Sequence, residues 1–261
     1  MSLYAQEPQT VGKVLDNAFH LFKLSFKKVV MFSIIYSIIV TLPVLVIDLA
    51  IKSIEETSMT PYIVLGVVSV LLIIPALIFT NGMTYRMHTL AIEDDCGFSK
   101  ALKTGLMKLL PVLVALIIYF LAVALGMILL IVPGFILMLS LFLYGVLIIV
   151  DDEKIIASLK KSHGLVWKNW WRTSLVLIVP VLVMMSISAV LGMIVLAGGF
   201  LAGGMTDLTF FESTAFIVLS NLINIPLYAV TMPLFMAVTL VQVHDLKLRK
   251  HGTDLEDRMA V

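Results

Sequence analysis

The chain has 261 residues, of which 61% are hydrophobic and only 13% are charged, and its formal net charge is +1. Because soluble domains contain about 25% charged residues, this composition excludes an ordinary soluble domain and indicates an integral membrane protein. The single cysteine, Cys96, excludes an intrachain disulfide framework and a metal site built from several cysteines.

Six apolar runs are long enough to cross a bilayer, because a hydrocarbon core of about 30 Å needs about 20 helical residues. The predicted spans cover about residues 29–51, 62–87, 109–132, 134–150, 173–198 and 213–243. The sequence therefore predicts an all-α, polytopic membrane protein in which residues 1–261 form a single integral membrane domain.

Three short amphipathic stretches precede the first, third and fifth spans. They cover about residues 10–28, 98–108 and 153–170, and each carries lysines and leads directly into an apolar run. Such stretches are typical of helices that lie at a membrane surface. We expect three interfacial helices on the cytoplasmic leaflet.

The third and fourth spans belong to one uncharged stretch, 109–150, which is interrupted only by Pro133 and Gly134. Proline lacks a backbone donor, and glycine can adopt a positive φ. The Pro133–Gly134 pair is therefore predicted to end one helix and to begin the next, so that the two spans form a hairpin. In the last span, 213–243, a tilt or a kink at Pro226 and Pro233 is expected because the run is longer than one crossing requires.

The basic residues are strongly segregated along the chain. Seventeen of the eighteen lysines and arginines lie in the N-terminal segment, the second and fourth connections and the C-terminal tail, and Lys52 alone lies elsewhere. Since loops rich in lysine and arginine stay on the cytoplasmic side, we expect both termini to be cytoplasmic.

The stretch "SLKKSHGLVWKNWWR", residues 158–172, contains all three tryptophans of the chain. As a helix, this region would place one broad apolar face against the membrane, formed by Ile155, Ile156, Leu159, Val166, Trp167 and Trp170. Lysine beside an anionic leaflet and tryptophan at headgroup level are typical of an interfacial helix. The predicted headgroup or interface residues are Lys160, Lys161, His163, Trp167, Lys168, Trp170, Trp171 and Arg172.

The acidic residues just before this stretch have a predicted local role. Asp151, Asp152 and Glu153 are expected in the first turn of the helix, where negative charge is favourable, and Asp152 is expected to cap it.

Three interpretations of the stretch differ in what the basic groups bind. Nucleic-acid binding would use the same residue types, but no recognition fold accompanies them, so no nucleic-acid partner is predicted. A specific phospholipid headgroup site would use Lys160, Lys161, His163 and Arg172. Anchoring at the membrane surface is the simplest interpretation, and it makes phospholipids the predicted partner.

Residues 131–172, "IVPGFILMLSLFLYGVLIIVDDEKIIASLKKSHGLVWKNWWR", resemble the signature of the YciC-like family of bacterial inner-membrane proteins. The family is itself similar to the membrane module fused to some glycerophosphodiester phosphodiesterases. The residues that carry the resemblance are Pro133, Gly134, Asp151, Asp152, Ala157, Ser162, Trp167 and Asn169. It implies a multi-pass protein of the bacterial inner (cytoplasmic) membrane, and it supplies no catalytic residue.

The chain contains no G-x-S-x-G elbow, no H-E-x-x-H helix and no Walker A loop. No cofactor is predicted. Histidines and carboxylates gather near the expected cytoplasmic boundary, but none of the histidines has chelating spacing, so no metal site is predicted. A lipid-modifying enzyme would require Asp94, Asp151 and His163 to converge.

A carrier or channel is the main alternative. The spans contain few ionisable residues, but amides occur at Asn81, Asn221 and Asn224, and these could line a cavity for a small neutral or lipid-like solute. The favoured interpretation is a non-enzymatic inner-membrane protein that interacts with lipids or acts as an assembly partner in envelope homeostasis. A protein partner or a homo-oligomer is compatible with it.

Overall fold

The computed structural model describes residues 3–53, 59–203 and 213–259, and these residues contain helices and no strand. The elements in chain order are α1 (Val11–Ser53), α2 (Thr60–Ala91), α3 (Gly97–Met107), α4 (Leu109–Leu129), α5 (Ile131–Leu141), α6 (Tyr144–Val150), α7 (Ile155–Val166), the 3-10 turn η1 (Trp167–Asn169), α8 (Trp170–Gly203), α9 (Thr214–Leu222) and α10 (Asn224–Met259). The predicted all-α class is confirmed.

Six segments of the described chain are long and apolar enough to cross a membrane. They are Val11–Lys52, Tyr62–Ala91, Leu109–Leu129, Ile131–Val150, Ile155–Leu201 and Thr214–Gly252. Each contains most or all of one predicted span. Three of them extend well beyond it, because neighbouring residues belong to the same helix or to a helix separated from it by only a short break.

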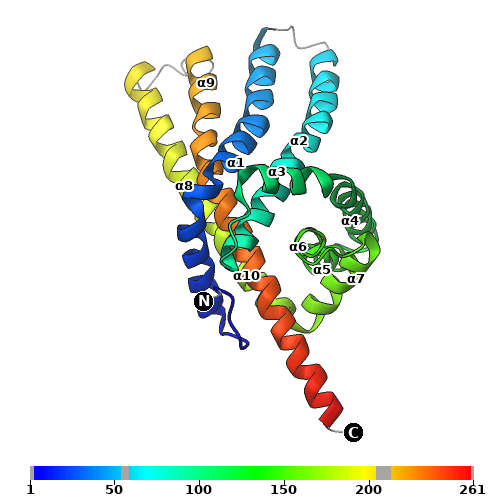
Figure 1. Ribbon diagram of the computed structural model, residues 1–261. Helices are drawn as coiled ribbons and strands as arrows, with labels where there is room; N and C mark the ends of the chain where they lie inside the picture. The colour runs from blue at the N-terminus through cyan, green and yellow to red at the C-terminus, as the bar shows by residue number, and fades with distance from the viewer. Residues whose placement is uncertain (1–2, 54–58, 204–212, 260–261) are drawn as a thin grey trace.

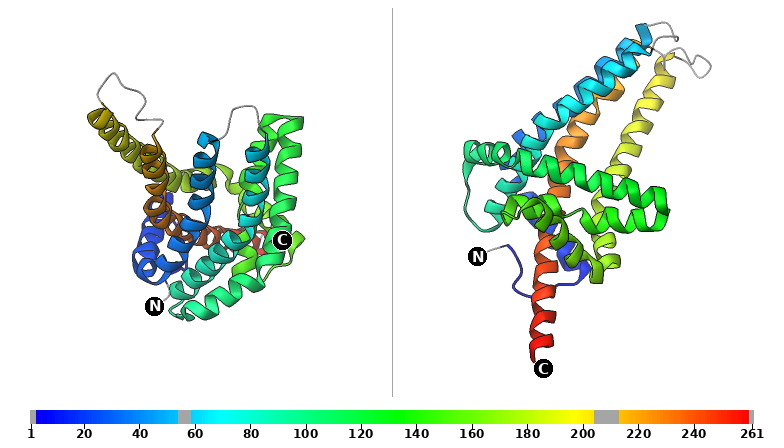
Figure 2. Two further views of the ribbon diagram at one scale, coloured as in Figure 1. Left: turned by 90° about the horizontal axis from the view of Figure 1, so that it is seen from above. Right: turned by 90° about the vertical axis from the view of Figure 1, so that its right-hand side faces the viewer.

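The long helices do not form six parallel spans. α1 packs most extensively along α10 and then along α2, and α8 also packs against α10. The end of α1, the start of α2, the end of α8 and the start of α9 lie at one end of the molecule, and the start of α1 and the end of α10 lie at the other (Figure 1). The α4–α5 hairpin instead runs across the direction of the other long helices, as the right-hand view of Figure 2 shows.

Two helix breaks, at Leu130 and Ile223, each lie three residues before a proline. α4 ends before Leu130, whose backbone is extended, and α9 ends before Ile223. In each case the next helix begins so that the proline, Pro133 or Pro226, is its third residue. A proline there needs no backbone donor, whereas inside a continuous helix its ring would clash with the carbonyl four residues earlier. The predicted turn at Pro133 and Gly134 therefore lies three residues earlier, at Leu130.

Glycine makes the α4–α5 hairpin compact. A Cβ at Gly126 would lie 2.9 Å from the Cα of Gly134, and a Cβ at Gly134 would lie 2.6 Å from the side chain of Met127. The two backbones approach more closely than any larger residue permits. Gly134 thus acts through its lack of a side chain and not through a positive φ, which was the expected reason.

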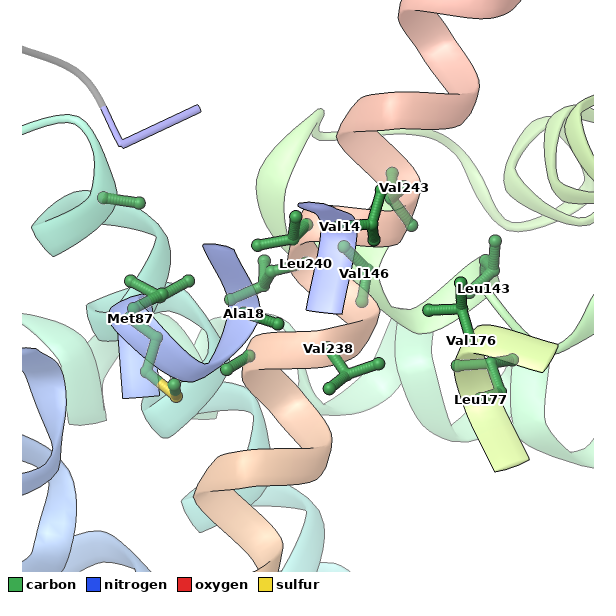
Figure 3. Packing of buried hydrophobic residues seen from close by; sticks show 14 of the residues in the cluster. Val14, Ala18, Met87, Leu143, Val146, Val176, Leu177, Val238, Leu240 and Val243 are labelled. Carbon is green, nitrogen blue, oxygen red and sulfur yellow. The ribbon is translucent and has the colours of Figure 1, made fainter. Parts of the chain in front are cut away.

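The core lies where α1, α2, α8 and α10 meet the α5–α6 turn. Val14 and Ala18 of α1 pack near Val238 and Val243 of α10 (Figure 3). Leu143, Val146, Met87, Val176, Leu177 and Leu240 belong to the same cluster. This cluster joins segments from both ends of the sequence, so it fixes the region from which the long helices extend.

One of the three expected interfacial helices is not a separate element, because residues 11–28 are the first turns of α1. α3 is a distinct short helix close to the predicted 98–108. α7 covers most of the predicted 153–170 and leads through η1 into α8.

The acidic residues before α7 do not form its first turn. α7 begins at Ile155, and its cap residue Lys154 makes no side-chain capping bond. Asp152 instead adopts a positive φ of 57°, which a short polar side chain tolerates better than most. Its carboxylate pairs with Lys108. The expected capping role of Asp152 is therefore wrong, because the chain uses this residue to turn between α6 and α7.

Candidate functional site

The segment 158–172 has an inward side and an outward side. The residues of α7 that are buried are Ser158, Leu159, Ser162, Leu165 and Val166. Ile156 and Trp167, which were expected on the membrane-facing side, are 52% and 57% exposed, whereas Leu159 and Val166, expected on the same side, are buried in the protein. Ser158 and Ser162 also lie inward, and their hydroxyl groups donate to the Ile155 and Ser140 carbonyls.

Lys161 lies on the inward side and is held by two carboxylates. Its Nζ atom is 2.9 Å from Asp151 Oδ2 and 2.8 Å from Glu153 Oε1. Asp151 also accepts a hydrogen bond of 2.6 Å from Lys247 on α10. Lys161 therefore links the α6–α7 turn and α10 through Asp151, and it is not an open basic group.

These contacts set the ionisation of Asp151. Burial alone would raise the pKa of the Asp151 carboxyl, but the hydrogen bonds from Lys247 and Lys161 bring that pKa below its ordinary value. The ionised Asp151 carboxylate thus forms ion pairs with both Lys161 and Lys247.

Arg172 is also held from the inside. Its guanidinium Nη2 lies 2.9 Å from Asp245 Oδ2, and the Asp245 side chain is only 4% exposed. The same oxygen accepts a hydrogen bond from Arg249 Nε, and the other Asp245 oxygen accepts one from the backbone N–H of Gln9. Arg172 and Arg249 both donate to the Gln9 carbonyl. This cluster, formed by Gln9, Arg172, Asp245 and Arg249, ties the N-terminal segment to α8 and α10.

Ser162 and His163 close the gap between α5 and α6. Ser162 Oγ donates to the Ser140 carbonyl at 2.7 Å and accepts from the Leu143 backbone N–H at 3.2 Å. His163 Nδ1 lies 3.1 Å from Ser140 Oγ, and its ring lies 5.1 Å from that of Trp167. Ser162 thus satisfies backbone groups that the helix break at Phe142 and Leu143 would leave unpaired, and His163 contacts the Ser140 side chain.

The outward side is apolar. All three tryptophans line a groove of about 580 Å³ together with Val132, Phe135 and Ile136 of α5. Trp171 is 76% exposed, and its ring meets that of Trp170 edge to face at 4.7 Å. We call this surface the tryptophan groove.

Two predicted cations differ from Lys161 and Arg172. Lys160 and Lys168 are exposed, and neither takes part in an ion pair within the described part of the chain. The predicted headgroup set therefore divides into two exposed lysines and two cations that stabilise the fold.

The three amides of the predicted cavity have separate hydrogen-bond partners. Asn81 donates to the Gly105 carbonyl and lines a cavity of about 360 Å³. Asn221 donates instead to Asp48 and to the Ile217 carbonyl, and Asn224 donates to the Ser220 carbonyl. Each amide is satisfied locally, and Asn221 and Asn224 lie beside the break between α9 and α10.

Two of the three residues that a lipid-modifying enzyme would require, Asp151 and His163, have different partners. Asp151 pairs with lysines, and His163 contacts Ser140. The described residues contain no group of three or more His, Cys, Asp or Glu side chains able to hold a metal ion.

Several residues of the site were not identified from the sequence. Asp245 and Gln9 were missed because their partner Arg172 lies 73 and 163 residues away in the chain. The α5 side of the groove was missed because Val132, Phe135 and Ile136 have the same character as every other apolar residue in the run. The one available signal for Asp245 was the position of a carboxylate between an apolar run and a basic tail.

Comparisons with known proteins place the chain in a family. The model of a family described as "Domain of unknown function (DUF7847)" matches residues 102–244, which is more than half of the 261 residues. The match contains the α4–α5 hairpin, the tryptophan groove and Asp151. Comparison with the curated proteins gave no match, and comparison with the solved structures gave none. The chain belongs to the DUF7847 family.

Proposed function

We propose that this protein is a multi-pass protein of the bacterial inner membrane that binds phospholipid acyl chains in the tryptophan groove. Its six long apolar segments would lie in the bilayer, and both termini would face the cytoplasm. The resemblance of residues 131–172 to YciC-like proteins supports the inner-membrane location. We propose a non-enzymatic role.

Exposed apolar surface supports membrane insertion. Val64 and Leu71 of α2 and Ile128 and Leu129 of α4 are each more than half exposed. Contiguous apolar surface of this extent is costly in water, whereas hydrocarbon covers it without penalty. The hydrogen-bonded helical backbone suits the same environment.

The observation that carries the lipid proposal is the meeting of all three tryptophans with the first turns of α5 in one open apolar groove. Trp171 presents most of its ring outward, and the exposed Lys168 lies on the same turn. A large amphipathic ring beside a cation is suited to the boundary between headgroups and acyl chains. The cation favours an anionic phospholipid.

Native mass spectrometry of the protein in mild detergent, with analysis of the lipids that co-purify, tests this function. The double variant Trp167→Ala/Trp171→Ala is expected to retain several-fold less phospholipid than the wild type. Leu201→Ala is the matched control, since it removes an 88% exposed apolar side chain from the other end of α8. Equal retention by all three proteins would contradict lipid binding in the groove.

A carrier for a lipid-like solute is the second candidate. It is supported by two cavities, of about 560 and 360 Å³, whose linings share Thr80, Phe142, Phe235 and Met236. The larger one is lined mainly by apolar side chains of α1, α2 and α10. Solute uptake by vesicles containing the purified protein, lost on narrowing this cavity with Ser69→Trp, would favour transport.

A further inference from the structure

Another cavity, of about 400 Å³, lies beside the tryptophan groove but shares no lining residue with it. Its lining comes from the N-terminal segment, the end of α7, η1 and the C-terminal part of α10: Pro8, Gly164, Leu165, Lys168, Asn169, Arg249, Lys250 and Gly252. Within η1, Trp167 faces the groove whereas Lys168 and Asn169 face this second cavity. We call it the basic cavity.

Three cations converge on the basic cavity from two elements. Lys168 comes from η1, and Arg249 and Lys250 come from α10, and none of the described lining residues is acidic. Asp245, which binds Arg249, also binds Arg172. The Asp245 carboxylate is therefore shared by two arginines.

The absence of a side chain at Gly164 leaves room for the ammonium group of Lys250. A Cβ at Gly164 would lie 3.6 Å from the Nζ atom of Lys250. Any long side chain at position 164 would enter the cavity beside this ammonium group. An anion bound in the cavity would lie close to this ammonium group and would be attracted to it.

We propose that the basic cavity binds a phosphate group, either a monoester or a diester. Lys168 and Lys250 would contact the phosphate oxygens, and the Asn169 side chain would add a neutral donor. Arg249 would contribute charge from a position fixed by Asp245. Several cationic donors around one space suit a group with three or four oxygens better than they suit a single carboxylate. The volume also accommodates a phosphate ester.

The two cavities have separate linings, so the phosphate site can stand or fail independently of acyl-chain binding in the groove, although Lys168 is close to both. It can therefore be tested with a soluble probe. We would follow inorganic phosphate by phosphorus NMR, titrating the full chain in a maltoside detergent that contains no phosphorus. Saturable line broadening is expected for the wild type.

Two variants test the site without disturbing the Asp245 cluster. Gly164→Glu places a carboxylate in the cavity, and Lys168→Gln removes an exposed cation. Each is expected to weaken phosphate binding about tenfold or more, as the loss of a charge-assisted hydrogen bond to an anion would. Lys160→Glu is the control, because it reverses a charge on the same helix outside the cavity lining and should change the affinity less than about twofold. Circular dichroism checks that each variant keeps its helices.

Competition identifies the source of the phosphate group. Displacement of inorganic phosphate by phosphatidic acid in the micelles would assign the site to a lipid headgroup. Displacement by glycerol 3-phosphate but not by the lipid would assign it to a soluble ester, and both outcomes uphold the site. The proposal is overturned if the wild type shows no saturable binding of any of these probes. It also fails if Gly164→Glu and Lys168→Gln bind phosphate as the wild type does.

Discussion

The inward and outward sides of segment 158–172 differ in how their side chains are satisfied. On the inward side, Lys161, Ser162 and Arg172 each have two or more polar partners within the protein. On the outward side, Trp167, Lys168 and Trp171 are exposed. One stretch of fifteen residues thus contains both the contacts that stabilise the fold and the surface available to a ligand.

This difference changes how basic residues beside membranes should be interpreted. A lysine or arginine in a cytoplasmic connection suggests a lipid headgroup contact. A carboxylate of the same protein can instead form an ion pair with that cation, which is then not available to a lipid. Variants of Lys161 or Arg172 therefore report on folding, whereas variants of Lys160, Lys168 and the tryptophans report on ligands.

The largest expected effect is on the inward side, at Asp245. Asp245→Asn would leave the guanidinium groups of Arg172 and Arg249 without their shared carboxylate. Removing one partner of a buried ion pair costs about 3–5 kcal/mol, so the thermal unfolding midpoint in detergent should fall strongly. Asp152→Asn is the control, since the Asp152 side chain is 86% exposed and its pair with Lys108 should contribute less than about 1 kcal/mol. Similar unfolding midpoints for both variants would show that the Asp245 cluster stabilises the fold no more than an exposed ion pair does.

A smaller loss is expected for Ser162→Ala. The substitution leaves the Leu143 N–H and the Ser140 carbonyl without their partner at the α5–α6 break. Unpaired buried backbone groups cost about 1–3 kcal/mol. Ser186→Ala on α8 provides the comparison, because its hydroxyl is exposed and bonds only to the Leu182 carbonyl. If both serine variants unfold at the wild-type temperature, the proposed bridge has no role in stability.

The pH dependence of unfolding sharpens the role of Asp151. Its lowered pKa means that the folded state favours the charged carboxylate, so this contribution is complete above the ordinary pKa of 3.8 and is lost as the pH falls through the folded value. The unfolding midpoint should therefore drop in acid. Asp151→Asn should be less stable at neutral pH and should show a weaker acid dependence than the wild type. Parallel curves between pH 7 and pH 3 would contradict the assignment.

The smallest effect on stability is expected on the outward side, at Trp171. Since most of this ring is exposed, Trp171→Ala should change the free energy of unfolding in detergent by less than about 0.5 kcal/mol. The same variant should lose retained lipid. A loss of stability as large as that of Ser162→Ala would contradict the assignment of Trp171 to the outward side.

The sequence predicts the helices better than their arrangement. The length of the apolar runs and the positions of Pro133 and Pro226 are sufficient to predict the long helices and to locate both breaks within three residues. The crossing direction of the α4–α5 hairpin depends on tertiary contacts that hydropathy does not describe. The cap expected at Asp152 failed because its side chain pairs with Lys108, 44 residues earlier in the chain.

The candidate site could be predicted only in part for the same reason. The tryptophans and lysines are recognisable as interfacial residues because their composition has a physical meaning by itself. Whether a given cation is open or paired depends on distant residues such as Asp245, and the second wall of the groove comes from α5. The basic cavity likewise needs α10 beside η1, which no local pattern reveals.

The most direct test of the account is fluorescence quenching in vesicles made from phospholipids with brominated acyl chains. All three tryptophans of the chain line the groove, so tryptophan fluorescence, excited selectively over the seven tyrosines, reports on this surface alone. The account predicts strong quenching by bromine in the acyl chains and weak quenching by aqueous iodide. Strong quenching by iodide with no response to the brominated chains would show that the groove faces water, and it would contradict lipid binding there.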